Sequence, residues 1–360
     1  MISTSLHSLN QAIEEDFQAR LPGYHKSRRE GLCLLSALML ECRTPNLMEL
    51  AAALPREIAT PDKRYQYIER QLSNPHIDVD KVSSAYARSV LERLCAEGQT
   101  LILMIDQSHI NEFNEVLMLS IRVGERAIPL LWRVRSTQGN IGFEVQKDLL
   151  EAALPFIPKG AQVMLAADRF YGTAALVGWC QEAGWGYRIR LKGNLTLEHE
   201  GAEITTGEAV RLCPEGLTEA ELYGRGVRTN IGFLHEKGHK EPWIIAMDCR
   251  PNEHRVLDYG MRWGIESMFS DFKSRGFGLM KSKIQRPERL EKLILIMTIA
   301  MHWAISCGML QKKKLRQAGK KGVRKIIRSA LSLFTEGLRF LRRCLSMALP
   351  LPQLWTVWLN

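Results

Sequence analysis

Four side chains that could do chemistry recur at regular intervals in the stretch YGMRWGIESMFSDFKSRGFGL. They are Tyr259, Arg262, Glu266 and Lys273. At about 100° per residue, an α-helix would carry all four on a stripe about 60° wide, with apolar residues beside the stripe for burial. A solvated pair between Arg262 and Glu266, four residues apart, explains these two charges equally well. The spacing therefore predicts a helix with one polar face and leaves the purpose of that face open.

Two aspartates each follow a continuous apolar run. Asp106 ends LILMID, and Asp168 follows QVMLAA. Each run predicts a buried strand that ends at an edge of a sheet, where a single aspartate is commonly a turn or a helix cap. Two of them on neighbouring strands, with Glu266 from a helix, would supply three carboxylates that suit Mg²⁺ or Mn²⁺. Asp248 follows a third such strand and is a spare carboxylate.

The order Asp106, Asp168, Glu266, with the motif Tyr-x2-Arg-x3-Glu-x6-Lys, resembles the DDE transposases of bacterial insertion sequences. The similarity is to the insertion-sequence-4-like family with the YREK signature, and it spans roughly residues 100 to 310. It implies an RNase H-like fold in which the three carboxylates are catalytic and hold Mg²⁺ or Mn²⁺, with two ions expected. Two such ions can activate a nucleophile and stabilise the leaving oxygen of a phosphodiester.

The resemblance also implies contacts with double-stranded DNA. It extends over ADRFYGT after the second aspartate and over the basic strand RIRLKGN. The residues predicted to contact DNA are Tyr259, Arg262, Lys273, Arg169, Arg190, Lys192 and Trp243. Trp243 matches a tryptophan that stacks on a flipped base while a hairpin forms at the transposon end. A core tryptophan in a strand is the alternative for this residue.

The function implied is cut-and-paste DNA transposition. The protein would bind the inverted-repeat ends of its own element as a dimer on DNA, cleave them and join them to a target. Two alternatives stay open: an RNase H-like nuclease without strand transfer, and a DNA-binding protein derived from a transposase. The intact set of three acids and four signature residues disfavours the second alternative.

The surrounding pattern predicts an α/β fold. We expect an all-helical, DNA-binding N-terminal region at 1–98 and an RNase H-like core at 99–193 and 242–310. Within 99–193 the order is strand, hairpin, helix, strand, helix, strand, with helices at Glu144 to Leu154 and Thr173 to Glu182. Short polar alternations predict a β-rich insertion at 194–241, and a basic helical extension follows at 311–360.

The composition of the chain indicates its class of protein, its partner and its location. The chain has 360 residues, 46% of them hydrophobic and 24% charged, which is ordinary globular composition. Its net charge is +10, and the part from Lys292 onward carries +12, so a polyanionic partner is expected for that region. The eight cysteines form no CxxC pair, and no secretory leader is visible, so we expect a cytoplasmic protein, associated with the nucleoid when bound to DNA. The apolar run from Leu293 to Leu310 is long enough to span a membrane, but a buried core helix explains it better.

Overall fold

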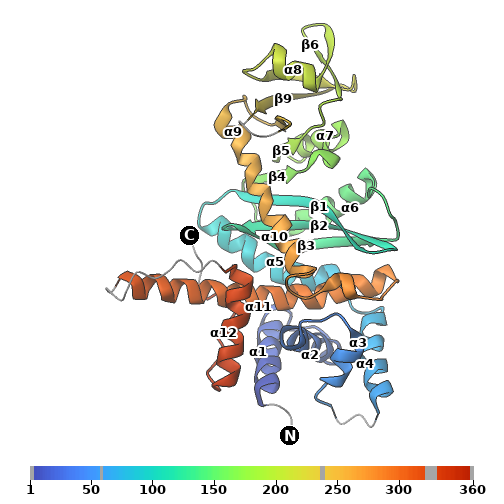
Figure 1. Ribbon diagram of the computed structural model, residues 1–360, viewed down its shortest axis with the longest axis vertical. Coiled ribbons are helices and arrows are strands. Elements are labelled where there is room, and N and C mark those ends of the chain that lie inside the picture. Colours follow the sequence, from blue (N-terminus) through green and yellow to red (C-terminus); the bar gives the residue numbers. More distant parts are fainter. Residues whose placement is uncertain (1–3, 57–59, 236–239, 321–330, 357–360) are drawn as a thin grey trace.

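The protein is built around one large mixed sheet. The computed structural model describes residues 4–56, 60–235, 240–320 and 331–356. In this part of the chain, ten strands pair in the order β3-β2-β1-β4-β5-β10-β9-β8-β6-β7. In Figure 1 the strands β6 and β9 belong to the upper end of the molecule, and helices fill the lower end. The architecture is mixed α/β, as the sequence predicts, and is compatible with an RNase H-like core.

The strands form where the sequence shows apolar runs or alternation. Their bounds are β1 Leu101–Asn111, β2 Asn114–Val123, β3 Arg126–Arg135, β4 Val163–Ala167, β5 Gly186–Arg190, β6 Thr196–His199, β7 Ala202–Thr205, β8 Leu217–Leu222, β9 Val227–Leu234 and β10 Trp243–Met247. Strands β1, β4 and β5 are parallel to one another, whereas β10 runs antiparallel to β5. All five residues of β4 are buried, as is typical of a strand that lies between two parallel neighbours.

Helices precede, connect and follow the strands. Their bounds are α1 Thr4–Arg20, α2 Lys26–Cys42, α3 Leu47–Ala52, α4 Pro61–Ser73, α5 Val79–Ala96, α6 Phe143–Ala153, α7 Ala174–Glu182, α8 Thr206–Leu212, α9 Glu253–Leu257, α10 Gly264–Phe272, α11 Pro287–Lys320 and α12 Leu333–Ser346. Short 3-10 turns are η1 Leu154–Phe156, η2 Arg169–Tyr171, η3 Asp258–Trp263 and η4 Leu279–Lys281. The two helices predicted between the core strands are found as α6 and α7.

Short polar side chains begin several of these helices. Thr60, Asp78 and Thr173 each accept a hydrogen bond from a backbone N–H in the first turn of α4, α5 and α7. Such caps satisfy N–H groups that have no partner inside the helix, and each is worth about 1 kcal/mol. The starts of these helices are therefore encoded locally.

Helix α11 joins the sheet to the helical end of the molecule. It packs on β3 and α5 on one side and on α2 and α4 on another, and Figure 1 shows it lying across the molecule between these layers. Its segment Pro287–Leu315 is long and apolar enough to cross a membrane, yet 94% of the most apolar stretch is buried inside the protein. The apolar run predicted as a core helix is thus a core helix here.

The predicted insertion and the predicted extension are both continuous with their neighbours. Strand β9 pairs with β10, so the insertion strands lengthen the central sheet. Helix α11 continues without a break through Lys312 to Lys320, so the first basic residues of the extension belong to the end of the core helix. Residues 321–330, which carry further basic residues of this extension, lie outside the described residues. The domain boundaries themselves stay a prediction.

Candidate active site

Asp106 and Asp168 lie on adjacent parallel strands. The paired residues at the ends of this ladder are Ile105 on β1 and Ala167 on β4, and each is followed directly by an aspartate. Backbone N–H groups hold both carboxylates: Gln107 N donates to Asp106 Oδ1 at 2.9 Å, and Arg169 N donates to Asp168 Oδ1 at 2.5 Å. The structure therefore brings together the two aspartates that the sequence singled out.

The spare carboxylate, Asp248, lies elsewhere. Because β10 runs antiparallel to β5, the end of β10 meets the start of β5, away from the edge that carries Asp168. Asp248 Oδ1 accepts hydrogen bonds from Arg188 Nη1 at 2.5 Å and from Tyr187 N at 3.4 Å. Strand direction thus excludes Asp248 from the site and gives it a structural partner.

The segment with the four signature residues is not one helix. The prediction of a continuous helix over Tyr259 to Lys273 is wrong: Tyr259 and Arg262 lie in the 3-10 turn η3, and only Glu266 lies within α10. Lys273 follows the end of α10, with φ −85° and ψ −108°. The shared face predicted from helical periodicity does not exist, although three of the four side chains still meet through direct contacts.

Arg262 joins these side chains to the first aspartate. Its Nη1 donates to Asp106 Oδ2 at 3.1 Å, its Nη2 donates to Glu266 Oε1 at 2.6 Å, and its Nε donates to the Tyr259 hydroxyl at 3.2 Å. The planar guanidinium offers donors in several directions, which a lysine could not reproduce. Arg262 is therefore the hub that links η3, α10 and β1. The spacing alone indicated the contact with Glu266 but not the one with Asp106, 156 residues away.

Burial sets the protonation chemistry of the site. The pKa of Asp106 is raised from 3.8 to about 6: burial is the largest cause, Arg262 lowers the pKa, and the charges of Asp168 and Glu266 raise it. Burial lowers the pKa of Lys273, which the charges of Glu115 and Asp106 raise in part. A second cation near Asp106 would favour the ionised carboxylate.

A divalent metal fits the donors by kind. Asp106, Asp168 and Glu266 offer hard carboxylate oxygens, the type that Mg²⁺ and Mn²⁺ prefer. Among the described residues, however, no three His, Cys, Asp or Glu side chains are placed to hold one ion together. The carboxylate of Glu266 binds Arg262 Nη2 at 2.6 Å, and its side chain is 57% exposed. The site has the required ligands, with the guanidinium of Arg262 as the cation between two of them.

Aromatic rings adjoin the signature residues. Trp243 packs edge to face on Tyr259, with ring centroids 5.1 Å apart, and on Trp263, with centroids 5.8 Å apart. Tyr259 is buried and Trp243 is half-buried, whereas Trp263 is 54% exposed. The sequence analysis did not select Trp263, although its place directly after Arg262 could have drawn attention to it. Trp263 is the ring of this group that is open to a ligand.

The remaining predicted DNA contacts lie beside Asp168. Arg169 pairs with Glu241 at 3.1 Å, and Arg190 approaches the same carboxylate at 3.8 Å. Lys192 lies over the ring of Phe170, which is 53% exposed and was also missed by the sequence analysis. Tyr259 and Arg262, at 2% and 6% exposure, are covered by protein in this structure, so their contact with DNA stays a prediction. The exposed cations form the accessible margin of the site.

A family comparison bears on this arrangement. Residues 143–303 match the family model of a transposase DDE domain. The match supports a DDE transposase and covers less than half of the chain, from α6 into α11. It includes Asp168, Trp243 and Glu266, whereas Asp106 lies on β1 before the matched residues. No curated protein is similar enough to the chain to count as a match.

Proposed function

We propose that the chain is an enzyme that transposes DNA by cutting and joining phosphodiester bonds at the ends of its own insertion sequence. The observation that carries the proposal is the pairing of β1 with β4, which sets Asp106 beside Asp168 within reach of Arg262 and Glu266. The transposase DDE domain match over residues 143–303 supports the same chemistry. The finer assignment to the insertion-sequence-4-like family rests on the YREK spacing.

The three carboxylates would hold divalent metal, with Mg²⁺ expected and Mn²⁺ as a substitute. Such ions, two of them in our proposal, would supply the Lewis acidity that phosphodiester cleavage and strand transfer need. The chain's own residues prepare the site: backbone N–H groups fix Asp106 and Asp168, and Arg262 positions the carboxylate of Glu266. Tyr259 accepts a hydrogen bond from Arg262 and so holds the guanidinium in place.

DNA would approach over the exposed margin of the site. Arg169, Arg190 and Lys192 would contact its phosphates once Glu241 is displaced, since ion pairs with exposed carboxylates are weak. Trp243 would take a flipped base at the cut end, with the exposed ring of Trp263 beside it. We further propose that two copies act together on paired DNA ends, in the cytoplasm, at the nucleoid.

A gel assay tests the proposal. Purified protein is incubated with Mg²⁺ and labelled duplex DNA that carries the inverted repeats flanking its gene, with Asp168→Asn as the matched variant. A joined product that appears with the wild type and not with the variant is the expected result. A cut product alone would favour a nuclease without strand transfer. A shifted band without cleavage would overturn the enzymatic proposal and leave a DNA-binding protein.

A further inference from the structure

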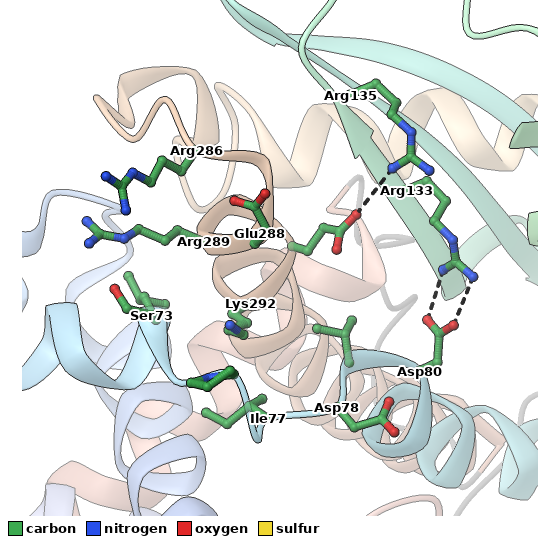
Figure 2. A pocket seen from close by; sticks show the side chains of 14 residues that line it. Ser73, Ile77, Asp78, Asp80, Arg133, Arg135, Arg286, Glu288, Arg289 and Lys292 are labelled. Atoms are coloured by element: carbon green, nitrogen blue, oxygen red, sulfur yellow. Dashed lines mark hydrogen bonds and ion pairs between the residues drawn. The ribbon is translucent and has the colours of Figure 1, made fainter.

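A cavity of about 570 Å³ lies where the helical region meets the core. It is bounded by the connection between α4 and α5, by the end of β3 and by the first turns of α11. Figure 2 shows Arg286 and Arg289 on one side of this cavity and Arg133 and Arg135 on the other. Most of the residues that line the cavity carry charge, so a charged ligand would find several partners there.

Lys292 lines this cavity and lacks a partner. The residue is only 7% exposed, yet within the described part of the chain its ammonium group forms no hydrogen bond and no ion pair. Burial lowers the pKa of Lys292, and the charges of Glu288 and Glu291 raise it in part. The ammonium nitrogen itself is not fully enclosed by protein but is accessible from the cavity, where no side-chain or backbone acceptor binds it. An anionic group in the cavity would supply the missing partner.

Two arginines add donors beside Lys292. Arg289 Nη1 donates to Glu69 at 3.0 Å, but the buried Nε of Arg289 has no acceptor in the structure. Arg286 is exposed and forms no ion pair with any described residue. Both precede or begin α11, so the positive end of a 34-residue helix adds to their charge. Point charge, guanidinium and helix terminus together suit a phosphate group.

The acids around the cavity are mostly engaged with other groups. Asp80 pairs with Arg133 at 2.9 Å, and Asp78 caps α5. Glu291 accepts a hydrogen bond from Val134 N at 2.9 Å. Of the four lining acids, Glu288 alone has no partner among the described residues, and it is exposed. The charge left for a ligand is therefore positive.

Cations also line the surface next to this cavity. Arg286 and Arg289 also line a neighbouring cavity of about 270 Å³ that includes Lys283. The residues before α11 are tied to the β1–β2 turn, because Asn111 Nδ2 donates to Ile284 O at 2.9 Å. From Asn111, Asp106 is about 17 Å away along β1. Cations that line two neighbouring cavities suit a polymer of phosphates better than one small anion.

We propose that the cavity around Lys292 binds a backbone phosphate of DNA that is held at the same time in the candidate active site. The proposal rests on the proposed function for the identity of the polymer, while the phosphate chemistry of the cavity rests on Lys292, its neighbouring arginines and the start of α11. The contact would fix the DNA against the junction of the helical region and the core. Because the backbone phosphate is the same in every sequence, this contact would raise the affinity for all DNA sequences equally.

Salt dependence of DNA binding tests the polymer. Wild type, Lys292→Met and Lys292→Arg are titrated with a labelled random duplex over a range of KCl concentrations. Each neutralised phosphate contributes about −0.9 to the slope of log K against log[KCl]. We expect Lys292→Met to make the slope less steep by about 0.9, and Lys292→Arg to keep the slope of the wild type. Lys159→Met, which removes an exposed lysine on another part of the surface, should leave the slope unchanged.

Thermal unfolding tests the phosphate chemistry without DNA. Inorganic pyrophosphate at constant ionic strength should raise the Tm of the wild type and of Lys292→Arg but not that of Lys292→Met. An unchanged salt slope in Lys292→Met, with the Tm effect present, would overturn DNA as the occupant and assign the cavity to a free phosphate compound. If neither measurement changes, the cavity binds no phosphate. Failure of the wild type to bind any DNA would overturn the proposed function, and with it DNA as the occupant.

Discussion

Replacing Asp106 by Asn should make the protein inactive and more stable. The carboxylate is 19% exposed, and burial raises its pKa from 3.8 to about 6 despite the contact with Arg262. Asn keeps the acceptor for Gln107 N, while Arg262 keeps its contacts with Glu266 and Tyr259. The substitution therefore removes a charge that is costly to bury and keeps the bond from Gln107 N, but it ends the hydrogen bond from Arg262 Nη1, because the amide NH2 is itself a donor. Cleavage should be lost because the proposed metal ligand is lost.

The magnitude follows from the pKa shift. A difference of about two units corresponds to roughly 3 kcal/mol by which folding disfavours the ionised carboxylate. The pKa of Asp106 is higher in the folded state than in the unfolded state. The ionised carboxylate therefore lowers the stability of the wild type in full above pH 6, and this destabilisation disappears as the pH falls below about 4. At pH 8 the variant should be more stable by up to roughly 3 kcal/mol, or up to about 4 °C in Tm for a chain of 360 residues that unfolds in one step.

The assay is thermal unfolding of metal-free protein at pH 8 and at pH 4. Glu92→Gln, which neutralises an exposed acid on α5, serves as the control and should change stability by less than about 0.5 kcal/mol at either pH. The reasoning fails if Asp106→Asn is no more stable than the wild type at pH 8. It also fails if the gain is as large at pH 4, because the gain would then have a cause other than the buried charge.

Further predictions concern the core and the DNA contacts. Burial lowers the pKa of His302 from 6.5 to about 3, so the free energy of unfolding should fall by up to about 5 kcal/mol as the pH drops from 6.5 to 3. In denaturant titrations, the stability of His302→Phe should fall less over the same pH range. A Cβ at Gly337 would overlap Ala304 O where α12 crosses α11, so Gly337→Ala should lower Tm by several degrees, whereas Gly178→Ala, with only Val227 at 3.6 Å, should be mild. Trp243→Ala should leave first-strand nicking normal and reduce the later products in a strand-resolved gel, and equal loss of both would indicate a core tryptophan. Arg262→Lys should lose cleavage per folded molecule, because a lysine cannot bridge Asp106 and Glu266, and an unchanged rate would contradict its role as the hub.

The two aspartates and the contact between Arg262 and Glu266 could be predicted from the local sequence. An apolar run followed by an aspartate indicates a strand and its end, so Asp106 and Asp168 could be selected without knowledge of their neighbours. The spacing of Arg262 and Glu266 likewise indicated a contact between residues four apart, and that contact is present at 2.6 Å. Each of these features depends on the residue's nearest neighbours in the chain, which is why pattern alone could find it.

Strand direction and helix limits were decided only by the tertiary structure. Asp106, Asp168 and Asp248 look alike in sequence, but β10 runs against β5 and carries Asp248 to the other edge. The polar stripe predicted over Tyr259 to Lys273 failed because η3 and the end of α10 interrupt the helix. Periodicity cannot foresee such limits, since packing against the sheet overrides local helical preference.

The contacts between distant residues also required the fold. Arg262 reaches Asp106 across 156 positions, and Lys292 faces a cavity built from the α4–α5 connection and β3. In the sequence Lys292 is only the first cation of a basic C-terminal part, and its burial without a partner is invisible. The sequence by itself determined which residues could do chemistry and which segments would be strands. Their meeting was decided by the tertiary structure, because the pairing of strands and the packing of helices join parts of the chain that share no local pattern.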